Sequence, residues 1–459
     1  MTTSLPTVSE LRQEFQPMFR LAVPVVFAEL GWVTMGMVDT LIVGPLGPEA
    51  IGAVGVGTSV FMGVCIFAMG LLLGLDTLVS QAFGAGDVED CHRWLVHGVV
   101  LAVALSVPVT GLLWWIGTGL DTWGLDPRVL AMTRPYLDIL AWSILPLLLY
   151  AAFRRYLQGM GVVRPVMVAL VSANIVNALV NWLLIYGKAG FPALGVRGSA
   201  WATVFARAVM AAFLLATILY RERGATAGVF KDLSLKLSWF VRLLRLGTPA
   251  ATQITLEVGV FAASTALAGR LVPAALAAHQ IAINYAALTF MVPLGIASAG
   301  AVRVGHAVGR QDVDGAARSG WTALLFAVMF MSIAASVFLF LPRFLLKAFT
   351  SDIGVLDVGV RLLFVAAVFQ LFDGVQGVAT GILRGLGDTR TPMLWNLFAH
   401  WFVGLPLGYT LCFIVGFGVV GLWWGLSLGL IICGFALLLV WSRRINALSL
   451  RPGAALDQP

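Results

Sequence analysis

Among the carboxylic acids that lie inside long apolar stretches of the chain, where a charged side chain is energetically costly, three are the main candidates for function: Asp39, Glu257 and Asp373. An acid at such a depth binds a cation, takes up a proton or accepts hydrogen bonds from its neighbours. We interpret all three as residues that bind a cation or a proton. Because hard cations prefer oxygen ligands, Glu257 and Asp373 are also candidate ligands for a sodium ion.

Each acid has polar or aromatic neighbours at helical spacing. Trp32 and Gly36 precede Asp39 on one face of a helix, and Gln253 lies one turn before Glu257. Asp373 belongs to a polar stripe with spacings of three and four residues: Gln370, Asp373, Gly377, Thr380 and Arg384. These neighbours are typical of a hydrated path or a binding surface.

Other polar residues in apolar stretches have interhelical hydrogen bonding as their default role: Asn174, Asn177, Asn181, His279, Gln280 and Asn284. We select six residues as candidates for contact with a small molecule: Trp32, Gln253, Asn174, Asn177, Asn284 and Gln370. Glu29 points roughly 80° away from Asp39 around the helix, and packing and function are equally good interpretations of it. Arg207 and His400 receive no assignment.

The composition places these residues in membrane-spanning helices. Soluble domains carry about 25% charged and 45–50% apolar residues, whereas this chain has 11% charged and 60% hydrophobic residues. We therefore predict an all-α integral membrane protein with twelve spans: 15–43, 50–83, 91–118, 129–156, 165–187, 196–220, 240–268, 275–308, 315–341, 355–383, 392–415 and 419–441.

Arginine and lysine gather at one set of span ends, and we count Arg154 and Arg155 in that rim. The positive-inside rule then predicts that both termini are cytoplasmic, in the inner (plasma) membrane of a cell. We expect no cleaved signal peptide, because the first residues lack its pattern.

The chain repeats itself with an offset of 225 residues. Pro24 corresponds to Pro249, Gly44 to Gly269 and Asp87 to Asp312, among other pairs. We predict two pseudo-symmetric six-helix lobes, 1–220 and 239–459, joined by a cytoplasmic linker at 221–238. Since each half has six spans, both halves insert with the same orientation.

Several function classes are excluded by what the sequence lacks. It has no phosphate-binding loop, no HExxH motif and no loop large enough for a catalytic domain. We expect no enzyme activity, no cofactor and no nucleic-acid partner. The four cysteines have no paired spacing and are interpreted as packing residues.

The chain resembles the multidrug and toxic compound extrusion (MATE) family, in its NorM-like branch. The resemblance rests on MVDTLIVGPLG at Asp39, QAFGAGD from Gln81, TLEVG at Glu257, AAHQIAIN at His279, VRVGHAVGRQD from Val302, FDGVQGVATGILRGLGDTRTPM from Phe372, GLPLGY at Gly404 and GLWWG at Gly421. It implies cation-coupled export of mostly cationic amphipathic drugs or toxic metabolites by alternating access. Asp39 matches the acid of the first-lobe cavity, and Glu257 and Asp373 match the cation-site acids of the second.

The helix containing Pro24 is expected to be kinked and to move when Asp39 is neutralised, because proline lacks an amide donor. The sequence leaves sodium and proton coupling open, and we expect a monomer in the lipid bilayer. Two alternatives remain: a flippase of lipid-linked oligosaccharides, and a membrane-embedded enzyme or receptor. A flippase would need several basic residues in its cleft to hold a diphosphate.

Overall fold

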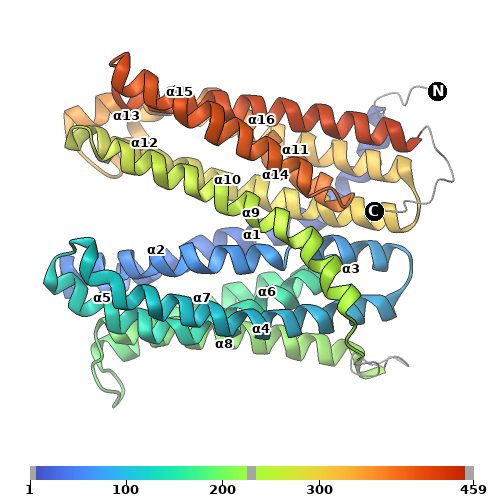
Figure 1. Ribbon diagram of the computed structural model, residues 1–459, viewed down its shortest axis with the longest axis horizontal. Coiled ribbons are helices and arrows are strands. Elements are labelled where there is room, and N and C mark those ends of the chain that lie inside the picture. Colours follow the sequence, from blue (N-terminus) through green and yellow to red (C-terminus); the bar gives the residue numbers. More distant parts are fainter. Residues whose placement is uncertain (1–6, 225–233, 450–459) are drawn as a thin grey trace. The chain divides into compact units, whose positions relative to one another are not determined.

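A computed structural model describes residues 7–224 and 234–449 of the chain (Figure 1). Over these two ranges the regular structure is entirely helical and contains no strand. Twelve segments within them are long and apolar enough to cross a membrane, and their ends lie within seven residues of the predicted ones. The predicted all-α fold with twelve spans is therefore confirmed. Residues 225–233 of the predicted linker lie outside the described residues.

The first half of the chain forms six spans from eight α-helices. They are α1 (Val8–Val43), α2 (Pro48–Leu71), α3 (Gly74–Gly84), α4 (Val88–Gly119), α5 (Pro127–Leu140), α6 (Ile144–Gly159), α7 (Arg164–Tyr186) and α8 (Val196–Arg221). The second predicted span consists of α2 and α3, and the fourth consists of α5 and α6, so two spans are interrupted where the sequence showed one continuous apolar run.

The second half contains a span with unusual helical geometry. The elements are α9 (Leu237–Ala268), α10 (Pro273–Gly309), α11 (Val313–Phe340), α12 (Pro342–Lys347), α13 (Ile353–Gly385), α14 (Arg390–Asn396), η5 (Leu397–Gly404), α15 (Leu405–Tyr409), η6 (Thr410–Ile414) and α16 (Gly418–Ser449). Both η5 and η6 are π-helical. Such segments are rare and occur often at functional sites.

The 225-residue repeat is visible in the backbone. Helices α4 and α11 begin after Asp87 and Asp312, whose φ and ψ angles are −90° and 83° in one and −92° and 86° in the other. Each aspartate accepts a hydrogen bond from a backbone N–H three residues later, at 2.8 and 2.7 Å. An aspartate in this position satisfies an otherwise unpaired donor of the first helical turn. The two halves thus use the same helix start at equivalent positions.

The contacts of the chain define two compact units. The N-terminal unit is Phe27–Ala251, and the C-terminal unit combines Met1–Val26 with Thr252–Pro459. The boundaries fall two residues after Pro24 and two residues after Pro249, which are equivalent in the repeat. These units differ from the predicted halves 1–220 and 239–459 because the beginnings of α1 and α9 are exchanged. The predicted lobes remain a description of the sequence repeat.

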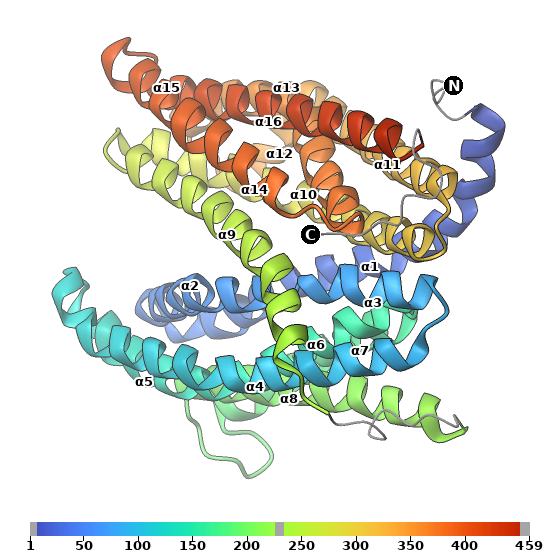
Figure 2. The ribbon, with the colours of Figure 1, turned by 45° about the vertical axis from the view of Figure 1, so that its right-hand side comes forward.

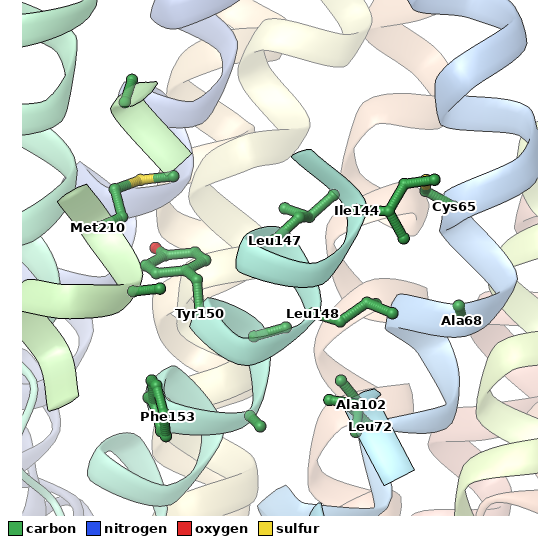
Figure 3. Packing of buried hydrophobic residues seen from close by; sticks show 14 of the residues in the cluster. Cys65, Ala68, Leu72, Ala102, Ile144, Leu147, Leu148, Tyr150, Phe153 and Met210 are labelled. Atoms are coloured by element: carbon green, nitrogen blue, oxygen red, sulfur yellow. The ribbon is translucent and has the colours of Figure 1, made fainter. Parts of the chain in front are cut away.

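The N-terminal unit is built around α6, which contacts α4 and α8, while α7 packs on α8 and α2 on α5. Figure 3 shows α6 side chains between residues of α2 and α8; it labels Ile144, Leu147, Leu148, Tyr150 and Phe153 on α6, Cys65 on α2 and Met210 on α8. All four cysteines of the chain are buried and free, as expected of packing residues. This core fixes the orientation of the polar residues on α6 and α8.

The C-terminal unit is organised around α13, which packs against α10, α11 and α16. Figure 2 shows the continuous stretch from α14 to α15 beside α16, and contacts join η5, α15 and η6 to α16. Glycines allow this close approach: a Cβ at Gly408 would lie 2.9 Å from the carbonyl oxygen of Leu422, and one at Gly425 would overlap the backbone of Gly408. Small residues commonly mediate such helix contacts in membranes.

The exchanged helix starts are held by different chemistry. In the C-terminal unit, Glu14 of α1 accepts hydrogen bonds from Arg303 at 2.6 and 2.7 Å and from Ser319 at 2.9 Å. In the N-terminal unit, the ring of Trp239 at the start of α9 lies 4.2 Å from the ring of Trp94. An aromatic contact is added at α1, where the ring of Phe15 lies 4.6 Å from that of Phe326. Ionic and aromatic contacts therefore hold the beginning of α1, and aromatic contacts hold the beginning of α9.

Candidate functional site

Asp39 lies in a buried polar cluster between α1, α7 and α8 of the N-terminal unit. Its carboxylate accepts hydrogen bonds from Asn181 Nδ2 at 2.7 Å and from Thr203 Oγ1 at 3.3 Å. Asn181 Nδ2 also lies 3.1 Å from Asn177 Oδ1, so the predicted residues Asp39 and Asn177 belong to one cluster. All four side chains are at least nine-tenths buried. Sequence reasoning missed Thr203, because a single small hydroxyl in an apolar helix does not stand out.

Arg207 lies in the same interior and was not assigned from the sequence. Its Nη1 donates to Ser143 Oγ at 2.6 Å, and its guanidinium carbon lies 4.4 Å from the ring centre of Phe61 and 6.0 Å from that of Trp32. A guanidinium over an aromatic ring makes a favourable cation–π contact. The face of Trp32 that we assigned to a small molecule is therefore next to a cation of the protein itself.

Two further acids of the N-terminal unit are paired with arginines. Arg154 Nη2 donates to Glu29 Oε1, and Arg155 Nη1 donates to Asp76 Oδ2 at 3.1 Å. Glu29 and Arg154 are both at least nine-tenths buried. Arg154 and Arg155, which we predicted to be rim charges, also pair with acids of the spans, because α6 continues past them to Gly159. For Glu29, the structure shows a buried ion pair within one unit.

Glu257 of α9 and Asp373 of α13 both belong to the C-terminal unit and lie within electrostatic range of each other. Asp373 is buried and Glu257 is half-buried. Asn396 Nδ2 lies 3.4 Å from Glu257 Oε2, and Gln376 lies beside the same carboxylate. In the described part of the chain, neither acid forms an ion pair with a lysine, arginine or histidine. The sequence did not single out Asn396 or Gln376, although Gln376 follows Asp373 by three residues on the same helix.

The amides near these two acids have partners of their own. Gln253 Nε2 donates to Thr380 Oγ1 at 3.3 Å, and Gln370 Nε2 donates to Thr289 Oγ1. Both glutamines are buried. Helices α9, α10 and α13 are thereby connected by polar contacts on either side of Asp373.

The remaining polar candidates are not all in these clusters. Asn174 Nδ2 donates to the carbonyl oxygens of Gly31 at 3.0 Å and Leu170 at 2.9 Å. Asn284 and Gln280 have exposed side chains on α10. Asp39 and the pair of Glu257 and Asp373 belong to different units.

His279 is held in one tautomer by its contacts. Trp423 Nε1 can only donate, and it lies 2.9 Å from His279 Nδ1, which must accept. The proton of the neutral ring is then on Nε2, 3.0 Å from Thr265 Oγ1, and Thr265 in turn donates to the carbonyl oxygen of Phe261. This agrees with the predicted default role in interhelical hydrogen bonding.

The donor set limits which ions the sites can hold. Among residues 7–224 and 234–449, no group of three or more His, Cys, Asp and Glu side chains is placed to hold a metal ion. A sodium ion at Glu257 and Asp373 would need neutral oxygens in addition to the two carboxylates. Two surface grooves, of about 350 and 320 Å³, contain none of the predicted site residues.

Comparison with known proteins places the chain in a family. The MatE family model matches residues 24–183 and 249–410, two matches whose starts differ by the 225 residues of the repeat. A probable multidrug resistance protein NorM of Mesorhizobium japonicum is 36% identical over 442 residues, 94% of each chain. Another, of Brucella suis, is 33% identical over 458 residues, 97% of each chain.

Solved structures agree with the fold. The crystal structure described as MATE in the bent conformation has a TM-score of 0.88 at 22% identity, covering 98% of this chain and 99% of that one. The outward-facing conformation of a multidrug resistance MATE family transporter of the MOP superfamily has a TM-score of 0.87, also at 22% identity, with the same coverage. The chain therefore belongs to the MatE (MATE) family of multi-pass membrane transporters, and its similar relatives are NorM proteins.

Proposed function

We propose that this protein is a multidrug efflux antiporter that exports organic, mostly cationic amphipathic compounds in exchange for sodium ions, protons or both. The observation that carries the proposal is the pair of Glu257 and Asp373 in the C-terminal unit, where Asp373 is buried, Glu257 is half-buried and neither has a basic partner among the described residues. Its relatives, which are named as probable multidrug resistance proteins, support the same proposal.

Two neighbouring carboxylates in a membrane interior repel each other and lose hydration, so their negative charge is costly unless a cation or a proton neutralises it. A cationic compound and a coupling ion can each supply that neutralisation. Binding of one then weakens the attraction for the other, which is the basis of exchange. Asp39 contributes a third acid to this proposal, in the other unit.

Alternating access requires a change that the ions can influence. The boundary between the compact units follows Pro24 on α1 and Pro249 on α9 by two residues. Proline removes one backbone hydrogen bond, so each helix is weakened at that boundary. We propose that neutralising the acids shifts the population of states that differ at these two points. Contacts with the transported compound are assigned to Trp32, Gln253, Asn174, Asn177, Asn284 and Gln370.

The energy available to such an exchange is sufficient. Moving one elementary charge across about 100 mV yields about 2.3 kcal/mol, which corresponds to roughly a fifty-fold concentration gradient. The membrane potential contributes only when the exchange carries net charge. A protein of this kind belongs in the inner (plasma) membrane, with both termini cytoplasmic, and functions as a monomer without a cofactor.

Efflux from proteoliposomes tests the proposal. Sodium and proton gradients are imposed separately on the parent protein and on Asp39→Asn, Glu257→Gln and Asp373→Asn. Asp357→Asn is the matched control, because Asp357 is exposed on the same helix as Asp373. We expect gradient-driven efflux of an organic cation by the parent and the control, and loss of it in Glu257→Gln and Asp373→Asn. Undiminished efflux in all three acid variants would contradict the ion-binding assignment.

The flippase alternative has less support in the geometry. A diphosphate is bound by several basic groups acting together. Of the buried arginines Arg154, Arg207 and Arg384, Arg154 is neutralised by Glu29. Movement of a lipid-linked sugar in the same vesicles, without efflux of any organic cation, would favour a flippase.

A further inference from the structure

We propose that Arg207 excludes sodium ions from the Asp39 cluster, so that sodium binding by this protein is confined to other acids. The inference rests on the proposed antiport, and it deepens that proposal by assigning an ion preference to one of the three acids. It concerns equilibrium binding and is tested without measuring transport.

The Asp39 cluster has the ligands that a hard cation prefers. The Asp39 carboxylate, the Oδ1 atoms of Asn177 and Asn181 and the Thr203 hydroxyl are all oxygens, and they come from three helices. Asn181 Oδ1 is buried and has no hydrogen-bond partner. Carboxylate, amide carbonyl and hydroxyl oxygens make up cation sites in proteins. Judged by its oxygens alone, this cluster resembles a sodium site.

Arg207 places a permanent positive charge beside these oxygens. It follows Thr203 by one helical turn on α8, so both side chains lie on the same face of the helix. Arg207 and Asp39 are within electrostatic range of each other but form no ion pair. Arginine remains charged under all ordinary conditions. Tyr136 and Cys65 are the other titratable groups near Arg207, and as neutral side chains they do not compensate its charge.

The contacts of Arg207 keep its charge in place. Ser143 accepts a hydrogen bond from Nη1, and the rings of Phe61 and Trp32 lie on the guanidinium. The arginine is at least nine-tenths buried, and its Nε has no hydrogen-bond partner. A metal ion at Asp39 would bring a second positive charge into the same low-dielectric interior, where like charges repel strongly. The charge of Arg207 thus partly compensates the Asp39 carboxylate, as a bound metal ion would.

The test uses the full-length protein in detergent, with Glu257→Gln and Asp373→Asn as a background that removes the acids of the C-terminal unit. The midpoint temperature of unfolding is measured in sodium chloride and in choline chloride of equal ionic strength. A ligand that binds only the folded state raises this midpoint in a saturable way. In the background protein we expect the two salts to give the same midpoint.

Adding Arg207→Gln should make sodium raise the unfolding midpoint in a saturable way. Sodium should bind at least about tenfold more tightly than in the background protein, a difference of about 1.4 kcal/mol. Adding Asp39→Asn to that variant should abolish the effect. Arg207→Lys, which retains the charge, should not produce it. If Arg207→Gln folds and gives no sodium effect, or if the background already shows one that Asp39→Asn removes, the proposal is wrong.

A second measurement does not depend on the folding of an Arg207 variant. Equilibrium binding of radioactive sodium is compared between the parent protein and Asp39→Asn. We expect the same number of sodium ions bound in both, because Asp39 contributes no site while Arg207 is present. A loss of one bound ion in Asp39→Asn would overturn the proposal.

Discussion

Three acids in the spans of the N-terminal unit have arginines beside them, whereas Glu257 and Asp373 of the C-terminal unit have no basic partner among the described residues. Glu29 pairs with Arg154 and Asp76 pairs with Arg155. Asp39 has Arg207 within electrostatic range. Glu257 and Asp373 have amide neighbours and each other. The N-terminal unit therefore supplies positive charge to these acids itself, and under the proposed function the pair of Glu257 and Asp373 obtains it from an ion or a transported compound.

This contrast shows how a duplicated scaffold can acquire two roles. The backbone of the repeat is retained at Asp87 and Asp312, but the repeat position of Asp39 is occupied by Ser264 and that of Trp32 by Glu257. On α9 the acid lies seven residues before the position equivalent to Asp39, and no arginine of the described residues is paired with it. The charge around the acid therefore differs between the two halves, although the fold is the same. Variants that alter this balance in either unit test the contrast directly.

The largest effect is expected from Arg154→Met, which leaves Glu29 buried without its partner. Breaking a buried ion pair in this way costs about 3–5 kcal/mol of unfolding free energy. Glu29→Gln combined with Arg154→Met should recover much of the loss, because no unpaired charge remains. The midpoint of thermal unfolding in detergent measures both, with exposed Arg164→Met as the control. Equal losses in the single and double variants would show that the ion pair is not the cause.

A smaller loss is expected from His279→Leu in the C-terminal unit. Trp423 Nε1 and Thr265 lose their buried partner, at a cost of about 1–3 kcal/mol for an unsatisfied donor. Because the fixed neutral tautomer gives His279 no charge to contribute, efflux per folded molecule should be unchanged. Thermal unfolding and efflux, each normalised to folded protein, check the two parts. If His279→Leu lost ion-driven efflux but kept its stability, His279 would have to carry a charge during transport, and the prediction would be wrong.

Gln376→Lys gives Glu257 the basic neighbour that it lacks among the described residues. The new charge lies beside Glu257, so we expect ion-driven efflux to fall at least about tenfold, or about 1.4 kcal/mol. Gln376→Met is the matched control, because it removes the amide without adding charge. Equal efflux by the two variants would show that the balance of charge around Glu257 is not important.

The smallest effect is expected at Gly36, whose repeat counterpart on α9 is Phe261. A Cβ at Gly36 would meet no atom within 4 Å, so Gly36→Ala should raise the unfolding free energy by about 0.5–1 kcal/mol through helix propensity alone. Gly425→Ala is the contrasting control, because its Cβ would overlap the backbone of Gly408. A destabilised Gly36→Ala would mean that the space beside α1 is filled in the folded protein.

The sequence predicted the twelve spans and the repeat because hydropathy, proline and glycine determine where membrane helices begin and end. It also singled out Asp39, Glu257 and Asp373, since acids stand out in apolar stretches, and the last two lie within electrostatic range of each other. It did not predict that Arg154 faces Glu29, because the sequence gives no contact between residues 125 positions apart. The π-helical segments also escaped prediction, because an apolar run looks the same whether its turns are α or π.

The exchange of helix starts between the compact units has a consequence for biosynthesis. The segment up to Val26 is made first, but Arg303 and Ser319, the partners of Glu14, follow it by 289 and 305 residues. The N-terminal unit is likewise completed only when the chain reaches Ala251 and Trp239 packs against Trp94. Neither unit is complete when the ribosome has made only the first six spans. A product truncated there would leave the beginning of α1 and the Trp94 face of α4 uncovered, and accessible to quality-control proteases.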